Sequence, residues 1–238
     1  MPATNTKTAG TFSFSGKTWP DAGKTVRRED SAQTERRYGM EGSIVIFRGS
    51  PRPHGNTNAL TDIAAARFRE AGLTVTEFDL YRMDIRPCMA CRECQKDWTR
   101  VNCIQKDDFE KLSSAVMESS LIILATPVYS WYCTAPMKAL LDRMVYAFNM
   151  YYGDERGPSL WEGKAVSLIT TCGYRPEKGA DLLEEGIRRY CRHSKLRYLG
   201  MLCERHLGYQ TVFMDDDKRS RACRYAEQLV EMIRRQDS

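Results

Sequence analysis

The stretch SIVIFRGSPRPHGNTNAL, residues 43–60, decides how this chain folds. A short apolar run at 44–47 ends before Gly49, a loop rich in Pro, Gly and Asn follows, and a helical pattern begins at Thr57 or Asn58. The first N–H groups of such a helix lack partners within the helix, and the helix dipole favours negative charge beside them. The stretch therefore predicts an anion site, with an ordinary hydrophilic strand–helix connection as the alternative.

Polar side chains in this loop add hydrogen-bond donors to the same place. Gly55 lets the backbone come close to a ligand, and His54 is expected either to donate to an anion or to face solvent. The remaining donors are Ser50, Arg52, Asn56, Thr57 and Asn58.

Strand and helix patterns alternate after this stretch. Asp107, followed by Glu110, resembles a capping box that opens a helix. The continuous apolar run at 121–129 predicts a central parallel strand covered on both faces. The other strands are expected at 73–80, 164–171 and 196–203, and the other helices at 57–71, 134–148, 180–194 and 215–235.

Five strands that each lead into a helix predict an α/β fold, a doubly wound parallel sheet with helices on both faces. Ligands of such folds bind beyond the carboxyl ends of the strands, near the point where the strand order reverses. Three loops leave strands at that edge, at residues 49–58, 127–134 and 171–174. The sequence therefore predicts one site built from these three loops.

Three motifs in these loops carry a family resemblance. GSPRPHGNTNAL after the first strand, ATPVYSWYCTAPMKALLDR after the third and ITTCGYRPEKGADLLEE after the fourth occur in order and at fitting distances. Together they resemble the flavodoxin-like NAD(P)H-dependent FMN reductase family, over about residues 42–235. The segment CMACRECQKDWTRVNC, followed by Asp107 and Asp108, resembles the iron–sulfur flavoprotein branch of that family.

The resemblance implies one FMN per subunit, reduced by NAD(P)H and reoxidised by a small acceptor such as a quinone, a free flavin or a nitro- or azo-aromatic compound. The FMN phosphate would lie on the first loop, against Ser50, Arg52, His54, Asn56, Thr57 and Asn58. The isoalloxazine would be lined by Pro127, Val128, Tyr129 and Ser130, and its pyrimidine side would be approached by the backbone of Thr171, Cys172 and Gly173.

The resemblance also implies a homodimer or homotetramer. The aromatic cluster Trp131, Tyr132, Tyr146, Tyr151 and Tyr152 would cover the flavin or fill a subunit interface, with core packing as the alternative. No catalytic acid or base is predicted, since hydride transfer to a bound flavin needs none.

Four cysteines stand close together as Cys88-x2-Cys91-x2-Cys94-x8-Cys103. Two successive two-residue gaps let three thiolates converge, and this spacing is more typical of a [4Fe–4S] cluster than of zinc, whose ligands usually come as two separated pairs. The last gap is longer than in the compact motif of iron–sulfur flavoproteins. A cluster, a redox-active thiol-rich loop and a zinc site are therefore all open interpretations.

A filled cluster would favour a second function. The chain would then be an electron carrier in which a [4Fe–4S] cluster exchanges electrons between a ferredoxin-like partner and FMN.

Residues 1–40 differ in composition from the rest of the chain. They are rich in Thr, Ser, Gly and charge, with almost no aliphatic side chains, and are predicted to form a disordered or loosely docked tail. Residues 41–238 are predicted to form one FMN-binding domain with a cysteine-rich insertion at 86–104. The tail has seven lysines and arginines against four acids, which is +3 of the net charge of +5. The remainder is nearly neutral, so no nucleic-acid partner is expected.

No apolar run approaches the length of a membrane span, and the first residues lack the features of a secretory or transit peptide. A cytoplasmic location without membrane contact is therefore expected. In a reducing compartment the nine cysteines are more often metal ligands, redox thiols or small core residues than disulfides. Cys191, Cys203 and Cys223 are expected to be buried core residues.

Overall fold

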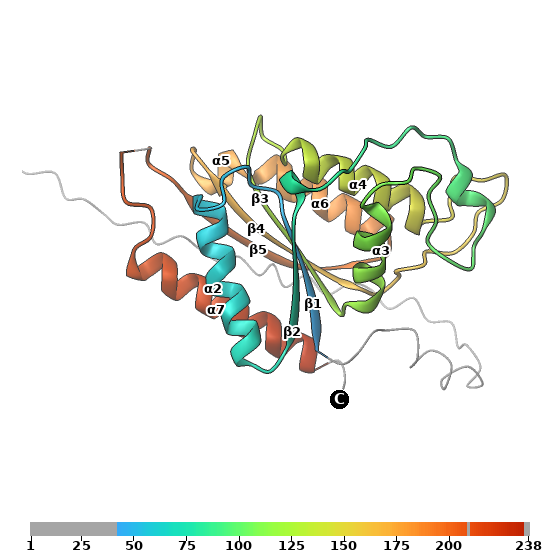
Figure 1. Ribbon diagram of the computed structural model, residues 1–238. Helices are drawn as coiled ribbons and strands as arrows, with labels where there is room; N and C mark the ends of the chain where they lie inside the picture. Colours follow the sequence, from blue (N-terminus) through green and yellow to red (C-terminus); the bar gives the residue numbers. More distant parts are fainter. Residues whose placement is uncertain (1–41, 209, 236–238) are drawn as a thin grey trace, which may run out of the picture.

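Five strands pair in parallel in one sheet, in the order β2-β1-β3-β4-β5 (Figure 1). The computed structural model describes residues 42–208 and 210–235. Successive strands are added on one side of β1 and then on the other, so the winding reverses between β1 and β3. The strands are β1 (Ser43–Arg48), β2 (Thr74–Asp79), β3 (Leu121–Pro127), β4 (Ala165–Cys172) and β5 (Arg197–Arg205).

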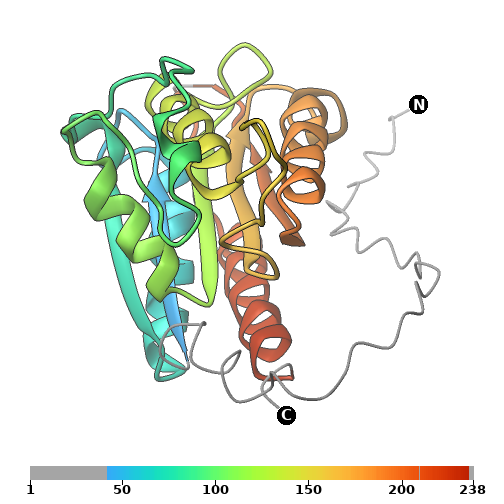
Figure 2. The same cartoon turned by 90° about the vertical axis from the view of Figure 1, so that its right-hand side faces the viewer.

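Helices cover both faces of this sheet. α2 and α7 lie on one face, and Figure 2 shows α3, α4 and α6 in front of the other. This arrangement confirms the predicted α/β, doubly wound, five-stranded parallel sheet. The helices are α2 (Asn56–Glu70), α3 (Phe109–Glu118), α4 (Ala135–Phe148), α5 (Pro176–Gly179), α6 (Asp181–His193) and α7 (Asp216–Arg234), with two 3₁₀ helices, η1 (Leu80–Arg82) and η2 (Glu93–Lys96).

The strands β3 and β4 are buried along nearly their whole length. Alternate residues of each strand point to opposite faces, so β3 feeds both apolar cores. Ile122 and Leu124 belong to the core under α3, α4 and α6, whereas Ile123 and Ala125 belong to the core under α2 and α7. A continuous apolar run is therefore required at the centre of the sheet.

Element boundaries depart from the sequence prediction in small ways. α2 begins at Asn56, one or two residues earlier than the predicted start at Thr57 or Asn58, with Gly55 as its N-cap residue. The short elements α5, η1 and η2 were not predicted, because each has too few residues to show a periodicity. The predicted tail at 1–40 lies outside the described residues. Within the part of the chain that the structure describes, no helix has the length and apolarity needed to cross a membrane.

A buried lysine joins the start of β4 to the end of α3. Lys164 is 2% exposed, and its Nζ donates to the carbonyl oxygens of Met117 at 2.9 Å and Ser119 at 2.5 Å. These carbonyls lie at the C-terminus of α3, where the helix dipole favours a cation. Burial nevertheless lowers the pKa of Lys164 to about 8.

This lowered pKa predicts a pH-dependent stability. An unfolded lysine has a pKa of about 10.4, so between pH 8 and pH 10.4 the unfolded chain binds more protons than the folded chain and stability rises with pH. The contribution of Lys164 to the free energy of unfolding should increase by up to about 3 kcal/mol over this range. Urea unfolding of wild type and Lys164→Met at several pH values measures it. The wild type should gain stability relative to Lys164→Met as pH rises, whereas Lys138→Met, at an exposed position, should run parallel to wild type. Parallel curves for Lys164→Met would contradict the assignment.

Candidate functional site

The three predicted loops meet at the carboxyl edge of the sheet. The hydroxyl groups of Thr57 and Thr171, on the first and third loops, are 2.7 Å apart and buried. The N–H group of Val128, on the second loop, donates to the carbonyl oxygen of Thr171 at 2.9 Å. Thr134 Oγ1 donates to the carbonyl oxygen of Gly49 at 2.7 Å, which joins the first and second loops. The loops therefore form one connected structure.

The first loop is folded tightly around the carbonyl group of Arg52. This oxygen accepts hydrogen bonds from Gly55 N at 3.0 Å, Asn58 Nδ2 at 3.0 Å and Ser50 Oγ at 3.3 Å. A Cβ atom on Gly55 would lie 3.0 Å from the Cβ atom and 3.1 Å from the carbonyl oxygen of Arg52, so a side chain there would require the loop to shift by a few tenths of an ångström. The close approach explains why glycine precedes α2.

The six predicted anion-binding residues differ in exposure. Ser50, Thr57 and Asn58 are buried and support the loop, and the Asn58 Oδ1 atom has no hydrogen-bond partner although it is buried. Asn56, the first residue of α2, is half-buried, whereas Arg52 and His54 are exposed. The first turn of α2 carries no acidic residue that would compete with a ligand for the helix N-terminus. The arrangement can hold an anion by N–H groups, with positive and polar side chains beside it.

The second loop presents aromatic rings to solvent on a constrained backbone. Tyr129 and Tyr132 exchange two backbone hydrogen bonds of 2.9 Å across a two-residue turn. Ser130 and Trp131, at the centre of this turn, have φ angles of 50° and 61°. Left-handed backbone is unfavourable for these residue types, and strain of this kind tends to occur at functional sites. Tyr129 and Trp131 are 47% and 48% exposed.

The third loop adds an aromatic residue that the sequence interpretation did not single out. Tyr174 stacks on Trp131, with ring centroids 6.0 Å apart and planes inclined by 13°. We name Tyr129, Trp131 and Tyr174 the aromatic rim. The position of Tyr174 within a predicted site loop was the available signal.

Cys172 lies beneath this rim and faces a second cysteine. Its Sγ atom is 3.7 Å from the Sγ atom of Cys203 on β5 and donates to the carbonyl oxygen of Tyr174 at 3.2 Å. The hydrogen bond from Cys203 lowers the pKa of Cys172, against the opposing effect of burial. Cys203 is only partly buried, as is Cys223, so of the three cysteines predicted as core residues only Cys191 is fully buried.

The four clustered cysteines line one small cavity of about 20 Å³. Cys94 is buried and its Sγ donates to the carbonyl oxygen of Tyr146 at 3.4 Å. Burial raises the pKa of the Cys94 thiol, and the nearby thiols of Cys88, Cys91 and Cys103 raise it further when ionised. Within residues 42–208 and 210–235, no three Cys, His, Asp or Glu side chains stand in a metal-ligating arrangement. The structure gathers the four thiols without placing them at ligand distances.

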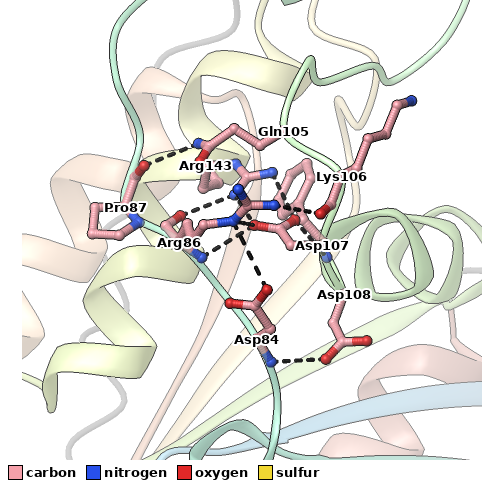
Figure 3. Close-up of polar contacts among 9 residues, drawn as sticks. Asp84, Arg86, Pro87, Gln105, Lys106, Asp107, Asp108 and Arg143 are labelled. Carbon is pink, nitrogen blue, oxygen red and sulfur yellow. Dashed lines mark hydrogen bonds and ion pairs between the residues drawn. The ribbon is translucent and has the colours of Figure 1, made fainter.

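The two ends of the cysteine segment are tied to each other (Figure 3). Asp84 and Asp108 exchange two hydrogen bonds, from Asp84 N to Asp108 Oδ2 at 2.8 Å and from Asp108 N to Asp84 O at 3.0 Å. Gln105 Nε2 donates to the carbonyl oxygen of Pro87 at 3.0 Å. Residues 88–104 therefore form a closed loop outside the sheet.

A buried ion pair anchors this loop to α4. Arg143 donates from Nη1 to Asp107 Oδ2 at 2.8 Å and from Nη2 to Asp107 Oδ1 at 3.1 Å (Figure 3). Burial alone would raise the pKa of Asp107, but Arg143 and the N–H groups of Arg86 and Phe109 lower it overall. The predicted capping box is wrong because the N-cap residue of α3 is Asp108, not Asp107. Asp107 still accepts a hydrogen bond from the N–H group of Phe109, in addition to its ion pair with Arg143.

The chain is similar in sequence to known flavoproteins. Residues 43–186 match the family model described as NADPH-dependent FMN reductase. An iron–sulfur flavoprotein from Archaeoglobus fulgidus is 36% identical over 143 residues, which is 60% of this chain and 60% of the relative. An iron–sulfur flavoprotein from Methanocaldococcus jannaschii is 32% identical over 42% of this chain and 50% of the relative. The match thus spans about half to three fifths of the length of these relatives.

The fold also occurs in solved structures. An NAD(P)H:quinone oxidoreductase from Methanothermobacter marburgensis superimposes with a TM-score of 0.59 at 18% sequence identity, over 79% of this chain and 97% of that protein. This similarity concerns the fold alone.

The bond from Thr134 to Gly49 predicts a stability effect at the site. Thr134→Val keeps the shape of the side chain but leaves the buried Gly49 carbonyl without its donor, which should cost about 1–3 kcal/mol in the free energy of unfolding. Thr76→Val, at an exposed position on β2, should change stability by less than about 0.5 kcal/mol. Urea unfolding measures both, and equal losses would show that the loop-to-loop bond contributes nothing.

Proposed function

Because this chain belongs to the NADPH-dependent FMN reductase family, we propose that it is an FMN-dependent oxidoreductase that takes electrons from NAD(P)H and passes them to a small acceptor. The acceptor classes we propose are quinones, free flavins and nitro- or azo-aromatic compounds. The observation that supports this function best is the joining of three loops around the N-terminus of α2, at the point where the strand order reverses.

The residues at this edge fit FMN. The phosphate would be held by the first N–H groups of α2 with Ser50, Arg52, His54, Asn56, Thr57 and Asn58, because a helix N-terminus whose first turn carries no acidic residue suits a dianion. The unpartnered Asn58 Oδ1 atom leaves a hydrogen-bond acceptor for a ligand hydroxyl group. When bound, FMN accepts a hydride from a nicotinamide and gives the electrons up again.

The other two loops would orient the flavin ring. One side of the flavin ring would be lined by Pro127, Val128, Tyr129 and Ser130. The strained turn would keep these residues in place without reorganisation. The backbone of Thr171, Cys172 and Gly173 would present N–H groups to the pyrimidine side, where they stabilise negative charge without titrating. The chain would thus bind and orient, and no side chain is assigned as a proton donor or acceptor.

The aromatic rim has a proposed role in assembly. Its three exposed rings stand next to the proposed flavin site, so we propose that a second copy of the chain covers them in a homodimer or a homotetramer. Sedimentation of the flavin-loaded protein would distinguish these from a monomer.

A second candidate function is supported by the cysteine cavity. Four thiols lining one cavity fit a [4Fe–4S] cluster, which would exchange single electrons with FMN and with a ferredoxin-like partner. A cluster would have to draw the thiols into ligating positions, because they are not there already.

Anaerobic purification separates the two candidates. A yellow protein that oxidises NAD(P)H in the presence of a quinone supports the reductase. A brown protein with about four iron and four sulfide per chain that accepts electrons only from a reduced ferredoxin supports the carrier. A colourless protein that does not take up FMN would overturn both.

The phosphate assignment predicts a selective loss of affinity in Arg52→Ala. Removing the guanidinium should weaken FMN binding at least about tenfold, or ~1.4 kcal/mol, and leave riboflavin binding unchanged because riboflavin has no phosphate. Quenching of flavin fluorescence measures both affinities. Arg192→Ala, at an exposed position on α6, is the matched control and should bind both flavins as wild type does. Equal weakening for FMN and riboflavin would contradict the assignment.

The cluster assignment predicts the iron content of cysteine variants. Cys91→Ser removes one proposed ligand from an exposed position and should reduce iron per chain at least severalfold after anaerobic reconstitution. Cys223→Ser, on α7, should retain the wild-type iron content. Full iron in Cys91→Ser would show that this cysteine is not a ligand.

A further inference from the structure

One buried cation faces the cysteine cavity from outside the cysteine segment. Arg143, on α4, lines the cavity together with the four cysteines, and its side chain is 1% exposed. The 3₁₀ helix η2, which contains Cys94, packs against the same helix. A charged side chain therefore borders the cavity without belonging to the loop that encloses it.

The guanidinium group is only partly satisfied by the protein. Its two Nη atoms donate to the Asp107 carboxylate and, from Nη1 at 2.9 Å, to the carbonyl oxygen of Arg86 (Figure 3). The Nε atom is buried and has no hydrogen-bond partner. Buried polar groups are nearly always paired, so an orphaned N–H beside four thiols points to an acceptor that comes with them.

We propose that Arg143 is a positioning residue that holds a fixed positive charge against the four-cysteine site and raises the reduction potential of the cluster bound there. This inference rests on the iron–sulfur cluster of the second candidate function. Cluster potentials depend on nearby charge and on hydrogen bonds to the sulfur atoms, and arginine supplies both. Because arginine is not deprotonated in proteins, its charge persists at every working pH.

The effect of this charge on the reduction potential of the cluster has a definite direction. Reduction adds one electron to a [4Fe–4S] cluster that four thiolates already make anionic, and it breaks no bond. A neighbouring cation stabilises the reduced form more than the oxidised form, whereas the Asp107 carboxylate opposes this effect. Arg143 and Asp107 should therefore have opposite effects on the reduction potential. Of the two, Arg143 is the residue that lines the cavity.

The opposed charges can be separated by three variants of the full chain. Asp107→Asn removes the carboxylate and keeps an acceptor oxygen for Arg143. Adding Arg143→Met in that background removes the cation without leaving a buried carboxylate unpaired. Arg143→Lys keeps the charge and is the conservative control. Each protein is reconstituted anaerobically with iron and sulfide, and the cluster potential is measured by dithionite titration monitored by electron paramagnetic resonance.

We expect Asp107→Asn to raise the reduction potential of the cluster. The potential of the double variant should lie at least about 59 mV below that of Asp107→Asn, which is a tenfold smaller equilibrium constant for a one-electron reduction. Arg143→Lys keeps the positive charge and should stay close to wild type. A structural anchor alone would change iron retention but would not move the potential in opposite directions.

Equal potentials in Asp107→Asn and the double variant would overturn the role of Arg143 while leaving the cluster in place. Absence of iron from wild type would overturn the cluster itself, and with it this role. If the double variant does not fold, Arg143→Gln in the Asp107→Asn background takes its place, and equal potentials in Asp107→Asn and that variant would likewise overturn the role of Arg143.

Discussion

The pairing of β1 with β3 is the constraint on which the functional edge depends. Because the chain adds β2 on one side of β1 and β3 on the other, the loops after β1 and β3 separate at the carboxyl edge and open toward opposite faces. Gly49 N still donates to Ala125 O at 2.7 Å, so the first loop leaves the sheet at a defined point. Thr134 then holds the Gly49 carbonyl, and the N-terminus of α2 is directed to this edge.

A second constraint fixes the cysteine segment. A loop of this length, outside the sheet, would cost considerable conformational entropy if its ends were free. The hydrogen bonds between Asp84 and Asp108 close it, and the Asp107–Arg143 pair attaches it to α4. Both charges of that pair are buried, which is tolerated because the guanidinium and carboxylate meet in a two-point contact. The anchor therefore brings a permanent charge to the edge of the cysteine cavity.

Much of the fold could be predicted from local patterns. The apolar run of β3 and the strand–loop–helix signal at 43–60 each depend on neighbouring residues, so both were recognisable without tertiary information. The short helix α5 and the true partner of Asp107 were not. A four-residue helix has no periodicity to detect, and an Asp followed three residues later by Glu looks like a cap whether or not an arginine packs against it.

The sequence by itself determined the order of strands and helices, the three loops at one edge, and four cysteines near one another, since all of these follow from periodicity and spacing. Only the tertiary structure decided which side chains meet. Thr57 contacts Thr171, Cys172 faces Cys203, and Arg143 reaches Asp107 across the chain. Contacts between residues so distant in sequence depend on strand register and helix packing, and neither leaves a local pattern.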